Sequence, residues 1–237
     1  MWLAIKETIF SGLQFLHDIT GDYGVAIILL TVAIRLLMIP LTVKQTRSMY
    51  EMQRIQPKIK ELQKKYKKDK EKLQEETLKF YQDNKVNPFG GCLPLLLQMP
   101  VFIALYQVLG GTPDQPGLFL EYVASLPEAE QAAATGFWII LPDLTATPSA
   151  IWSTGGFFAA LPYALLVVLF GLSIWLPQML MPGENQQKQI AGIMAVFMLY
   201  IGWISPAGVL LYWVTSSVLG IAQQQIQLKL LGHGEEA

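Results

Sequence analysis

The stretch VAIILLTVAIRLLMIPLTV, residues 25–43, decides the fold class because it is long, apolar and contains a single charged residue, Arg35. A bilayer core about 30 Å thick is crossed by about 20 helical residues. The stretch can therefore span a membrane, and Arg35 would lie near the midplane. An arginine at that depth costs at least about 2.5–3.5 kcal/mol unless water or a partner solvates it. The protein has to supply one or the other.

The composition agrees with a membrane protein. Hydrophobic residues make up 52% of the 237 residues and charged residues only 15%, which is unusual for a soluble domain. The motif SPAG, 205–208, separates the last two apolar runs, so we expect a tight turn and an antiparallel hairpin there. The sequence thus predicts an all-α integral membrane protein with five transmembrane helices, in which the first run is followed by the apolar runs 93–109, 157–181, 190–204 and 207–222.

Basic residues predict the orientation in the membrane. Residues 44–85 contain 13 Lys and Arg against 7 Asp and Glu, whereas residues 113–156 contain acids but no Lys or Arg. By the positive-inside rule, 44–85 is cytoplasmic and 113–156 is external. We therefore expect a multi-pass protein of the cell membrane with its N-terminus outside and its C-terminus inside.

The N-terminal residues have the pattern of an amphipathic helix. They lack a basic start followed by an unbroken apolar stretch, and no A-x-A cleavage pattern follows, so a secretion signal is not indicated. We expect an external helix lying in the outer interface, and the alternative is a frayed tail. The apolar residues that recur at helical spacing are Trp2, Ile5, Ile9, Leu13 and Leu16.

Residues 44–85 are predicted to form a helical hairpin. The motif KKDK, 67–70, offers a turn with Asp69 as N-cap of a second helix ending near Asn84, and Pro57 would kink the first arm or start a new helix. The alternative is that the segment is only a solvated, charged topology signal. The apolar face of the first arm steps by three or four through Met49, Met52, Ile55, Ile59, Leu62 and Tyr66.

Together these patterns predict the order of segments along the chain. It is an external interfacial amphipathic helix (1–22), first span (23–43), cytoplasmic helical hairpin (44–85), second span (86–112), external connection (113–156), third span (157–181), cytoplasmic loop (182–189), fourth span (190–204), fifth span (205–228) and short cytoplasmic tail (229–237). Within the external connection, GFWIILPDL, 136–144, is too short to span and is predicted to be interfacial or partly re-entrant.

The residues required for catalysis are missing from the spans. The two histidines, His17 and His233, lie near opposite chain ends, Cys92 is the single cysteine, and no Gly-rich phosphate loop or pair of intramembrane acids occurs. We therefore predict no catalytic residue, metal site or cofactor, and no enzyme. An ion-coupled transporter would carry several ionisable groups in its spans. Nucleic-acid binding is not indicated either, because acids are interleaved with the basic residues and no aromatic platform accompanies them.

Four blocks in order carry a family resemblance. They are IRLLMIPLT (34–42), QPKIKELQKKY (56–66), NPFGGCLPLLLQMPVFIALYQVL (87–109) and SPAGVLLYWVTSSVLGIAQQQ (205–225). The sequence resembles the YidC family of membrane protein insertases, as a bacterial member with a five-span core. The resemblance implies five helices around a hydrophilic groove, open to the cytoplasm and to lipid and closed outside, with one arginine in the groove.

Arg35 occupies the position of that arginine, and the other groove residues we expect are Thr31, Gln98 and Trp213. Each has an alternative. Arg35 could extend to an interface, although about ten residues of helix at about 1.5 Å each separate it from either end. The Thr31 hydroxyl could bond its own backbone, and Trp213 could serve only packing.

The resemblance implies a membrane protein insertase and chaperone that works without nucleotide hydrolysis, alone or with the Sec translocon. The expected partners are nascent membrane protein clients and the lipid bilayer, with the Sec translocon and the ribosome as further candidates. The short acidic end LLGHGEEA argues against ribosome docking through the tail. The alternatives are a small-solute channel and a structural subunit of a translocase.

Overall fold

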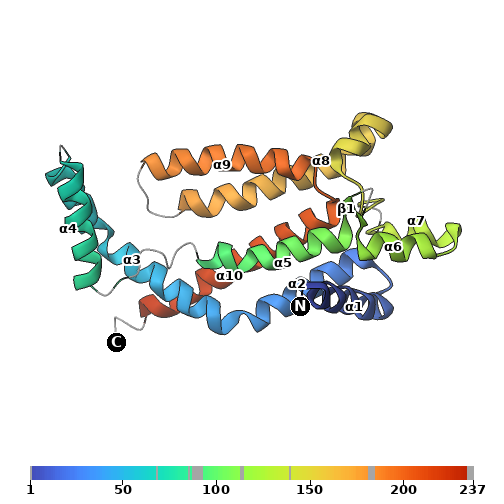
Figure 1. The fold of residues 1–237 in the computed structure, drawn as a ribbon, viewed down its shortest axis with the longest axis horizontal. Helices are drawn as coiled ribbons and strands as arrows, with labels where there is room; N and C mark the ends of the chain where they lie inside the picture. Colours follow the sequence, from blue (N-terminus) through green and yellow to red (C-terminus); the bar gives the residue numbers. More distant parts are fainter. Residues whose placement is uncertain are drawn as a thin grey trace. The chain divides into compact units, whose positions relative to one another are not determined.

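The computed structural model of the chain describes residues 2–67, 69–84, 86, 93–112, 115–138, 140–180 and 185–233, which are helical apart from one short strand pair (Figure 1). The predicted all-α class is confirmed. The described residues do not include Cys92, nor parts of the predicted loop 182–189 and of the predicted tail 229–237. The helices are α1 (Trp2–Thr20), α2 (Tyr23–Leu37), α3 (Ile39–Lys65), α4 (Lys70–Asp83), α5 (Leu93–Leu109), α6 (Leu118–Ser125), α7 (Glu128–Thr135), α8 (Pro148–Leu180), α9 (Asn185–Trp203) and α10 (Ala207–His233), and the antiparallel strands are β1 (Gly111–Thr112) and β2 (Gln115–Pro116).

The chain divides into two units. The core unit comprises Met1–Leu37 and Met99–Ile221, and the hairpin unit comprises Met38–Gln98 and Ala222–Ala237. The division falls within α5 and α10, so each of these helices contributes residues to both units.

In the core unit, α1 packs against α2 and α6. Gly21, with φ +72°, ends α1 by donating its N–H to the His17 carbonyl at 2.6 Å, as left-handed glycines do at helix ends. A helix is thus present where a frayed tail was the alternative. Its predicted apolar face is turned largely into the protein, since Leu13 is fully buried and Ile9 and Leu16 pack on the core. The large apolar residues of α1 that remain exposed are Trp2, Leu3, Ile5, Phe15 and Ile19.

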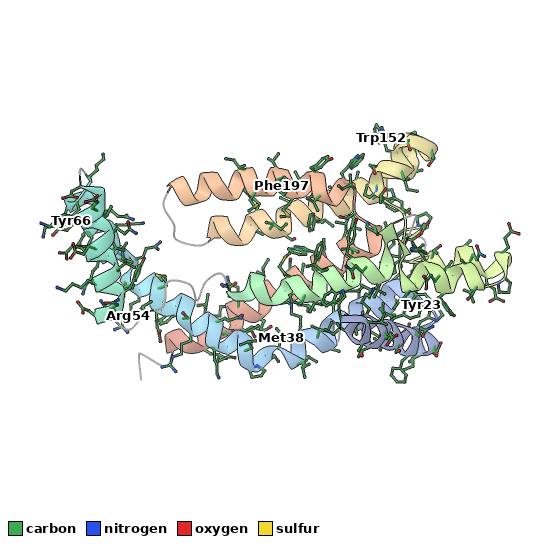
Figure 2. The ribbon with its side chains drawn as sticks, viewed as in Figure 1. Tyr23, Met38, Arg54, Tyr66, Trp152 and Phe197 are labelled. Carbon is green, nitrogen blue, oxygen red and sulfur yellow. The ribbon has the colours of Figure 1, made fainter. Side chains whose placement is uncertain are left out.

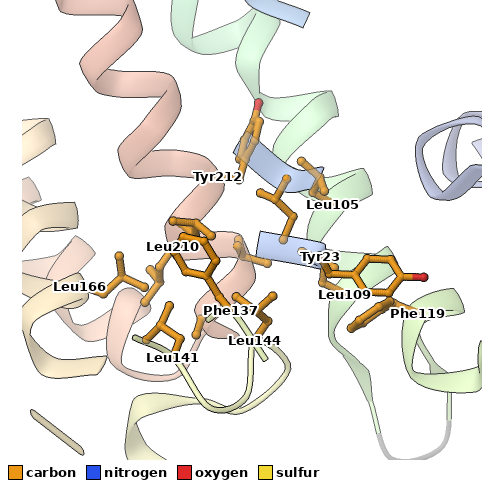
Figure 3. Close-up of a cluster of buried hydrophobic side chains, with 14 of the residues drawn as sticks. Tyr23, Leu105, Leu109, Phe119, Phe137, Leu141, Leu144, Leu166, Leu210 and Tyr212 are labelled. Carbon is orange, nitrogen blue, oxygen red and sulfur yellow. The ribbon is translucent and has the colours of Figure 1, made fainter. Parts of the chain in front are cut away.

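The predicted external connection is a folded part of the core unit. Its helices α6 and α7 lead to a tight turn in which Phe137 and Leu141 form a bridge. Figure 3 shows side chains from this connection gathered with those of α2, α5, α8 and α10. The buried members labelled there are Tyr23, Leu105, Leu109, Phe119, Phe137, Leu141, Leu144, Leu166, Leu210 and Tyr212.

The same connection is hydrogen-bonded to the first turn of α10. The N–H groups of Ala207 and Gly208 donate to the carbonyls of Ala146 and Leu144, at 3.0 and 2.7 Å. First-turn N–H groups have no partner within their own helix, so these bonds satisfy donors that would otherwise be unpaired. Gly208 permits the approach, because an added Cβ would lie 3.3 Å from the Leu144 carbonyl oxygen and 3.1 Å from Leu109 Cδ1.

The third and fourth predicted spans lie side by side as α8 and α9 (Figure 1). Gly156 breaks α8 with φ +70° and ψ −168°, a conformation available almost only to glycine. The predicted third span begins one residue later. Gly171 lets α9 approach closely, because an added Cβ would collide with Leu199. The predicted hairpin of the fourth and fifth spans needs correction: the turn lies where SPAG predicted it, but α9 packs mainly on α8 rather than on α10.

The first predicted span is not one continuous helix. The helix α2 ends at Leu37 and α3 begins at Ile39, after Met38. Pro40 explains the break, because its ring would clash with the carbonyl of Leu36 and it has no N–H to donate. Arg35 therefore lies in the last turn of α2 rather than in the middle of a helix. The helix α3 continues without interruption from Ile39 to Lys65, so no helix ends at residue 43, and the span limit at that residue stays a prediction.

In the hairpin unit, α3 and α4 are joined by a short turn that contains Tyr66, labelled in Figure 2. The Asp69 carboxylate accepts the Lys72 N–H at 3.1 Å and caps α4, which confirms the predicted N-cap. The ring of Tyr66 lies 5.2 Å from the Lys65 ammonium and 5.6 Å from that of Lys72. Pro57 does not start a new helix, because α3 runs through it.

Within the described residues, one helical stretch, Pro148–Leu176, is long and apolar enough to cross a bilayer by itself. The helix α2 followed by the first part of α3 gives a second if the pair is one broken span. Two shorter apolar helices occupy Gln98–Leu109 and Gly192–Trp203. The number of five spans stays a prediction.

A buried tyrosine ties α8 to the connection and gives a test of this fold. The Tyr163 hydroxyl accepts the Asp143 N–H at 2.9 Å and donates to the Asp143 carbonyl at 3.0 Å, and Tyr163 is 1% exposed. We expect Tyr163→Phe to lower the unfolding free energy by about 1–3 kcal/mol, because two backbone groups lose their partner. Thermal unfolding in detergent measures the effect. Tyr200→Phe is the matched control, since Tyr200 is 62% exposed; equal midpoints for the two variants would contradict the prediction.

Candidate functional site

Arg35 is held against one face of α10. Its Nε–H donates to the Ser216 hydroxyl at 3.0 Å, and Ser216 is 3% exposed. One turn further along α10, an ideal Cβ added to Gly220 would lie 2.9 Å from Arg35 Nη2 and 3.0 Å from Nη1. The guanidinium thus lies beside the backbone of Gly220, in space that a side chain would fill. Residues four apart share one helix face. One face of α10 therefore presents to Arg35 both the Ser216 hydroxyl and the space left by the missing side chain of Gly220.

No acidic partner lies near this cation in the part of the chain that the structure describes. Arg35 takes part neither in the Arg47–Glu51 ion pair nor in the contact between His17 and Asp18. Arg35 remains partly exposed, and its place in the last turn of α2 puts it near the negative end of the helix dipole. The site is therefore a cation with a neutral hydrogen-bond partner and with donors available for a carboxylate.

Thr31 lies one turn before Arg35 on α2. It is 1% exposed, and its hydroxyl donates to the Ile27 carbonyl of its own helix at 2.7 Å. This is the alternative considered for Thr31 from the sequence. The Thr31 hydroxyl is therefore buried, and its hydrogen is already used within α2.

Trp213 lies between two aromatic rings of the core unit. Its ring centroid is 5.1 Å from that of Phe102 on α5 and 5.5 Å from that of Phe170 on α8, both edge to face. This packing is the alternative considered for Trp213. The buried indole Nε1–H, however, has no hydrogen-bond partner among the described residues. A buried donor without a partner costs free energy. This donor lies three residues before Ser216 on α10.

Gln98 belongs to the hairpin unit, whereas Arg35, Thr31 and Trp213 belong to the core unit. The structure therefore groups three of the four predicted site residues in one unit. It adds Ser216 and Gly220, which sequence reasoning missed. Their signal in the sequence was a small polar residue and a glycine four positions apart in the 207–222 run.

Polar contacts join α10 to α3 within the hairpin unit. The Thr46 hydroxyl donates to the side-chain amide oxygen of Gln227 at 2.6 Å, and the Gln223 side-chain amide donates to the Thr42 hydroxyl. Gln45 is 4% exposed, and its Nε2 has no partner among the described residues. We call these five residues the polar seam. In both contacts the paired residues are 181 positions apart.

Comparison with known proteins gives a consistent family. The family model described as "60Kd inner membrane protein" matches residues 15–232. The membrane protein insertase YidC of Cellvibrio japonicus is 39% identical over 228 residues, which cover 95% of this chain and 35% of the relative. The membrane protein insertase YidC of Magnetococcus marinus is 38% identical over 231 residues, which cover 97% of this chain and 36% of the relative.

A solved structure matches as well. The structure described as "Active YidC insertase crystal structure with the first transmembrane domain resolved" aligns with a TM-score of 0.68 and 30% identity, over 92% of this chain and 45% of that chain. This chain spans about a third of the length of the curated relatives it matches. The match to the family model nevertheless covers most of the present sequence. The chain therefore belongs to the 60Kd inner membrane protein family, the family of the YidC membrane protein insertases.

Proposed function

We propose that this protein inserts newly made membrane proteins into the inner membrane, without an enzymatic step, through a hydrophilic groove that contains Arg35. The observation that carries the proposal is the state of Arg35: partly exposed, hydrogen-bonded to a neutral hydroxyl, and without a carboxylate partner in the described residues. Ionisable residues within a membrane usually pair with one another or with backbone carbonyls, and they mark functional sites. A cation left without an acidic partner is suited to one that comes and goes.

The polar or acidic tail of a client would supply that partner. Moving such a tail into hydrocarbon without compensation is prohibitive, and water together with Arg35 lowers the desolvation cost. Transfer of the client's apolar segment to lipid supplies about 25 cal/mol per Å² of apolar area. The membrane potential adds about 2.3 kcal/mol per 100 mV for each negative charge that moves outward. Together these contributions remove the need for nucleotide hydrolysis.

The packing of the core unit supports a groove closed on the external side. Phe137, Leu141 and Leu144 are buried at the end of α2 that begins with Tyr23. Arg35 is twelve residues further along α2, about 18 Å at 1.5 Å per residue. Apolar side chains therefore fill the core at one end of α2, and the cation lies at the other.

Gln98, a groove residue expected from the resemblance, and the polar seam belong to the hairpin unit. The seam provides hydroxyl and amide groups, and the unused Nε2 of Gln45 could bind water or a polar stretch of a client. We propose that the protein works alone or with the Sec translocon. A small-solute channel and a structural translocase subunit are the competing functions, and neither requires a cation without an acidic partner.

The proposed orientation can be tested by labelling. Single cysteines are introduced at Lys67 and Glu128, which are both exposed, in a version with Cys92 replaced by Ser. Because the basic segment should face the cytoplasm, an impermeant thiol reagent added outside intact spheroplasts should label position 128 only. Position 67 should react after the membrane is opened. Labelling of both positions from the same side would rule out the proposed topology.

The hairpin of α3 and α4 is proposed to receive clients. Replacing residues 58–83 by a short flexible linker removes most of its amphipathic surface but keeps Thr42 and Thr46, which bond to Gln223 and Gln227 on α10. We expect the variant to reach the membrane and to insert clients poorly. Leu78→Ser, which changes one exposed apolar residue of α4, is a milder companion variant. Full insertion activity after the deletion would show that the segment acts only as a charged topology signal.

Insertion into liposomes tests the proposed function and the role of Arg35 together. The purified protein is reconstituted and given two matched single-span clients, one with an acidic tail and one with a neutral tail. The parent should insert both. Arg35→Lys should keep most of the activity because the charge remains, whereas Arg35→Ala should lose the acidic-tail client more than the neutral-tail client.

Ser216→Ala is the matched control for this experiment. It removes the hydroxyl that accepts from Arg35 Nε but leaves the guanidinium charged, so we expect a much smaller loss than in Arg35→Ala. Thermal unfolding in detergent accompanies each variant. If Arg35→Ala unfolds much earlier than the parent and loses both clients equally, Arg35 is a structural residue and the electrostatic mechanism is wrong.

A further inference from the structure

Trp138 has an unusual backbone conformation and an exposed ring. Its φ is +45°, in the left-handed region that bulky residues rarely adopt, and it is 69% exposed. Its neighbour Phe137 is 7% exposed and packs against Gly24, where an added Cβ would collide with the ring. The conformation thus buries Phe137 and turns the next side chain, Trp138, outward.

The turn is closed on itself and bears a second exposed apolar residue. Phe137 and Leu141 exchange backbone hydrogen bonds of 2.8 and 3.2 Å, and Leu141 is 2% exposed. Ile140, between them, is 53% exposed. Buried and exposed apolar residues therefore occur in one short turn, and a fixed backbone holds Trp138 and Ile140 on its outer side.

Asp22 holds this turn to the start of α2. One carboxylate oxygen, Oδ1, accepts the Val25 N–H at 2.9 Å and caps the helix, while the other, Oδ2, accepts the Trp138 N–H at 2.9 Å. Asp is well suited to both bonds because its carboxylate is acceptor-only. The backbone of Trp138 is thereby fixed at the level of the first turn of α2.

The position of Trp138 beside the first turn of α2 indicates its depth in a membrane, because α2 is an apolar helix and this turn is one of its ends. In a protein that spans a bilayer, helix ends of this kind lie at the boundary between hydrocarbon and headgroups. Trp is favoured at that depth, since its ring is apolar and its N–H can bond to headgroups or water. The turn is also close in sequence to Pro148–Leu176, the stretch able to cross a bilayer by itself.

We propose that Trp138 and Ile140 insert into the lipid interface beside the start of α2, and that Asp22 positions them there. The occupant of this surface is the lipid headgroup region, not a client and not another protein. The inference concerns how the core unit is anchored at one membrane surface. It holds for either orientation of the chain, because it depends on which helix end is close and not on which side of the membrane that end faces.

Tryptophan fluorescence with brominated lipids tests the proposal. The full chain is reconstituted in phosphatidylcholine vesicles, and the chain's six tryptophans are separated by subtracting the emission of Trp138→Phe from that of the parent. We expect the difference emission to be quenched most strongly by bromine placed high in the acyl chain. Bromine near the bilayer centre and aqueous iodide should quench it less.

A tryptophan introduced at Lys67, in the exposed turn between α3 and α4, is the control for a ring in water. It should respond to iodide and not to bromolipid. If the Trp138 emission behaves like this control, the proposal is wrong. If it responds to neither quencher, protein covers the ring, from a second copy or from the core itself, and the proposal is equally wrong.

Asp22→Asn tests the positioning role. The amide oxygen can still cap α2, and Asn is as good an N-cap as Asp, but the amide nitrogen would face the Trp138 N–H as a second donor. We expect the helix content to be unchanged and the quenching of Trp138 to lose its preference for shallow bromine, measured against Asp22→Asn combined with Trp138→Phe. Unchanged quenching would show that Asp22 does not position the ring. None of these readouts uses client insertion, so they are independent of the proposed function.

Discussion

The backbone hydrogen bonds between the first turn of α10 and the carbonyls of Leu144 and Ala146 are the contacts on which the core unit depends. They satisfy donors that could not stay unpaired in an apolar interior. They also bring the 136–147 segment between the helices, where its apolar residues join those of α2, α5 and α8 (Figure 3). With the first turn of α10 held there, Ser216 and Gly220 lie beside Arg35, about two and a half and three and a half turns further along.

The two ends of α2 differ in chemistry because different side chains surround them. Its first residues are enclosed by aromatic and aliphatic side chains, and the Asp22 carboxylate caps it. Its last turn carries a cation whose partner is a neutral hydroxyl. Apolar side chains thus surround the first end of α2, and a partly exposed cation lies at the other. The proposed function depends on this difference.

Glycines and prolines mark the places where helices meet or break. Pro40 follows the break between α2 and α3, and Gly156 divides α8 just before its long apolar part. Gly171 and Gly220 instead allow close approach, in one case of Leu199 on α9 and in the other of the Arg35 guanidinium. The second of these contacts matters most for function, because a side chain at position 220 would displace the charge that the proposed mechanism uses.

The sequence by itself determined the helical class, the family and the local features. The apolar run 93–109 coincides with α5, the turn before α10 falls within SPAG, and Asp69 caps α4, because periodicity and capping depend on residues only three or four apart. Only the tertiary structure decided that α9 packs on α8, that the connection is part of the core, and that Arg35 meets Ser216 across 181 positions. Such contacts depend on which faces fit together after the helices form, and no local pattern records that.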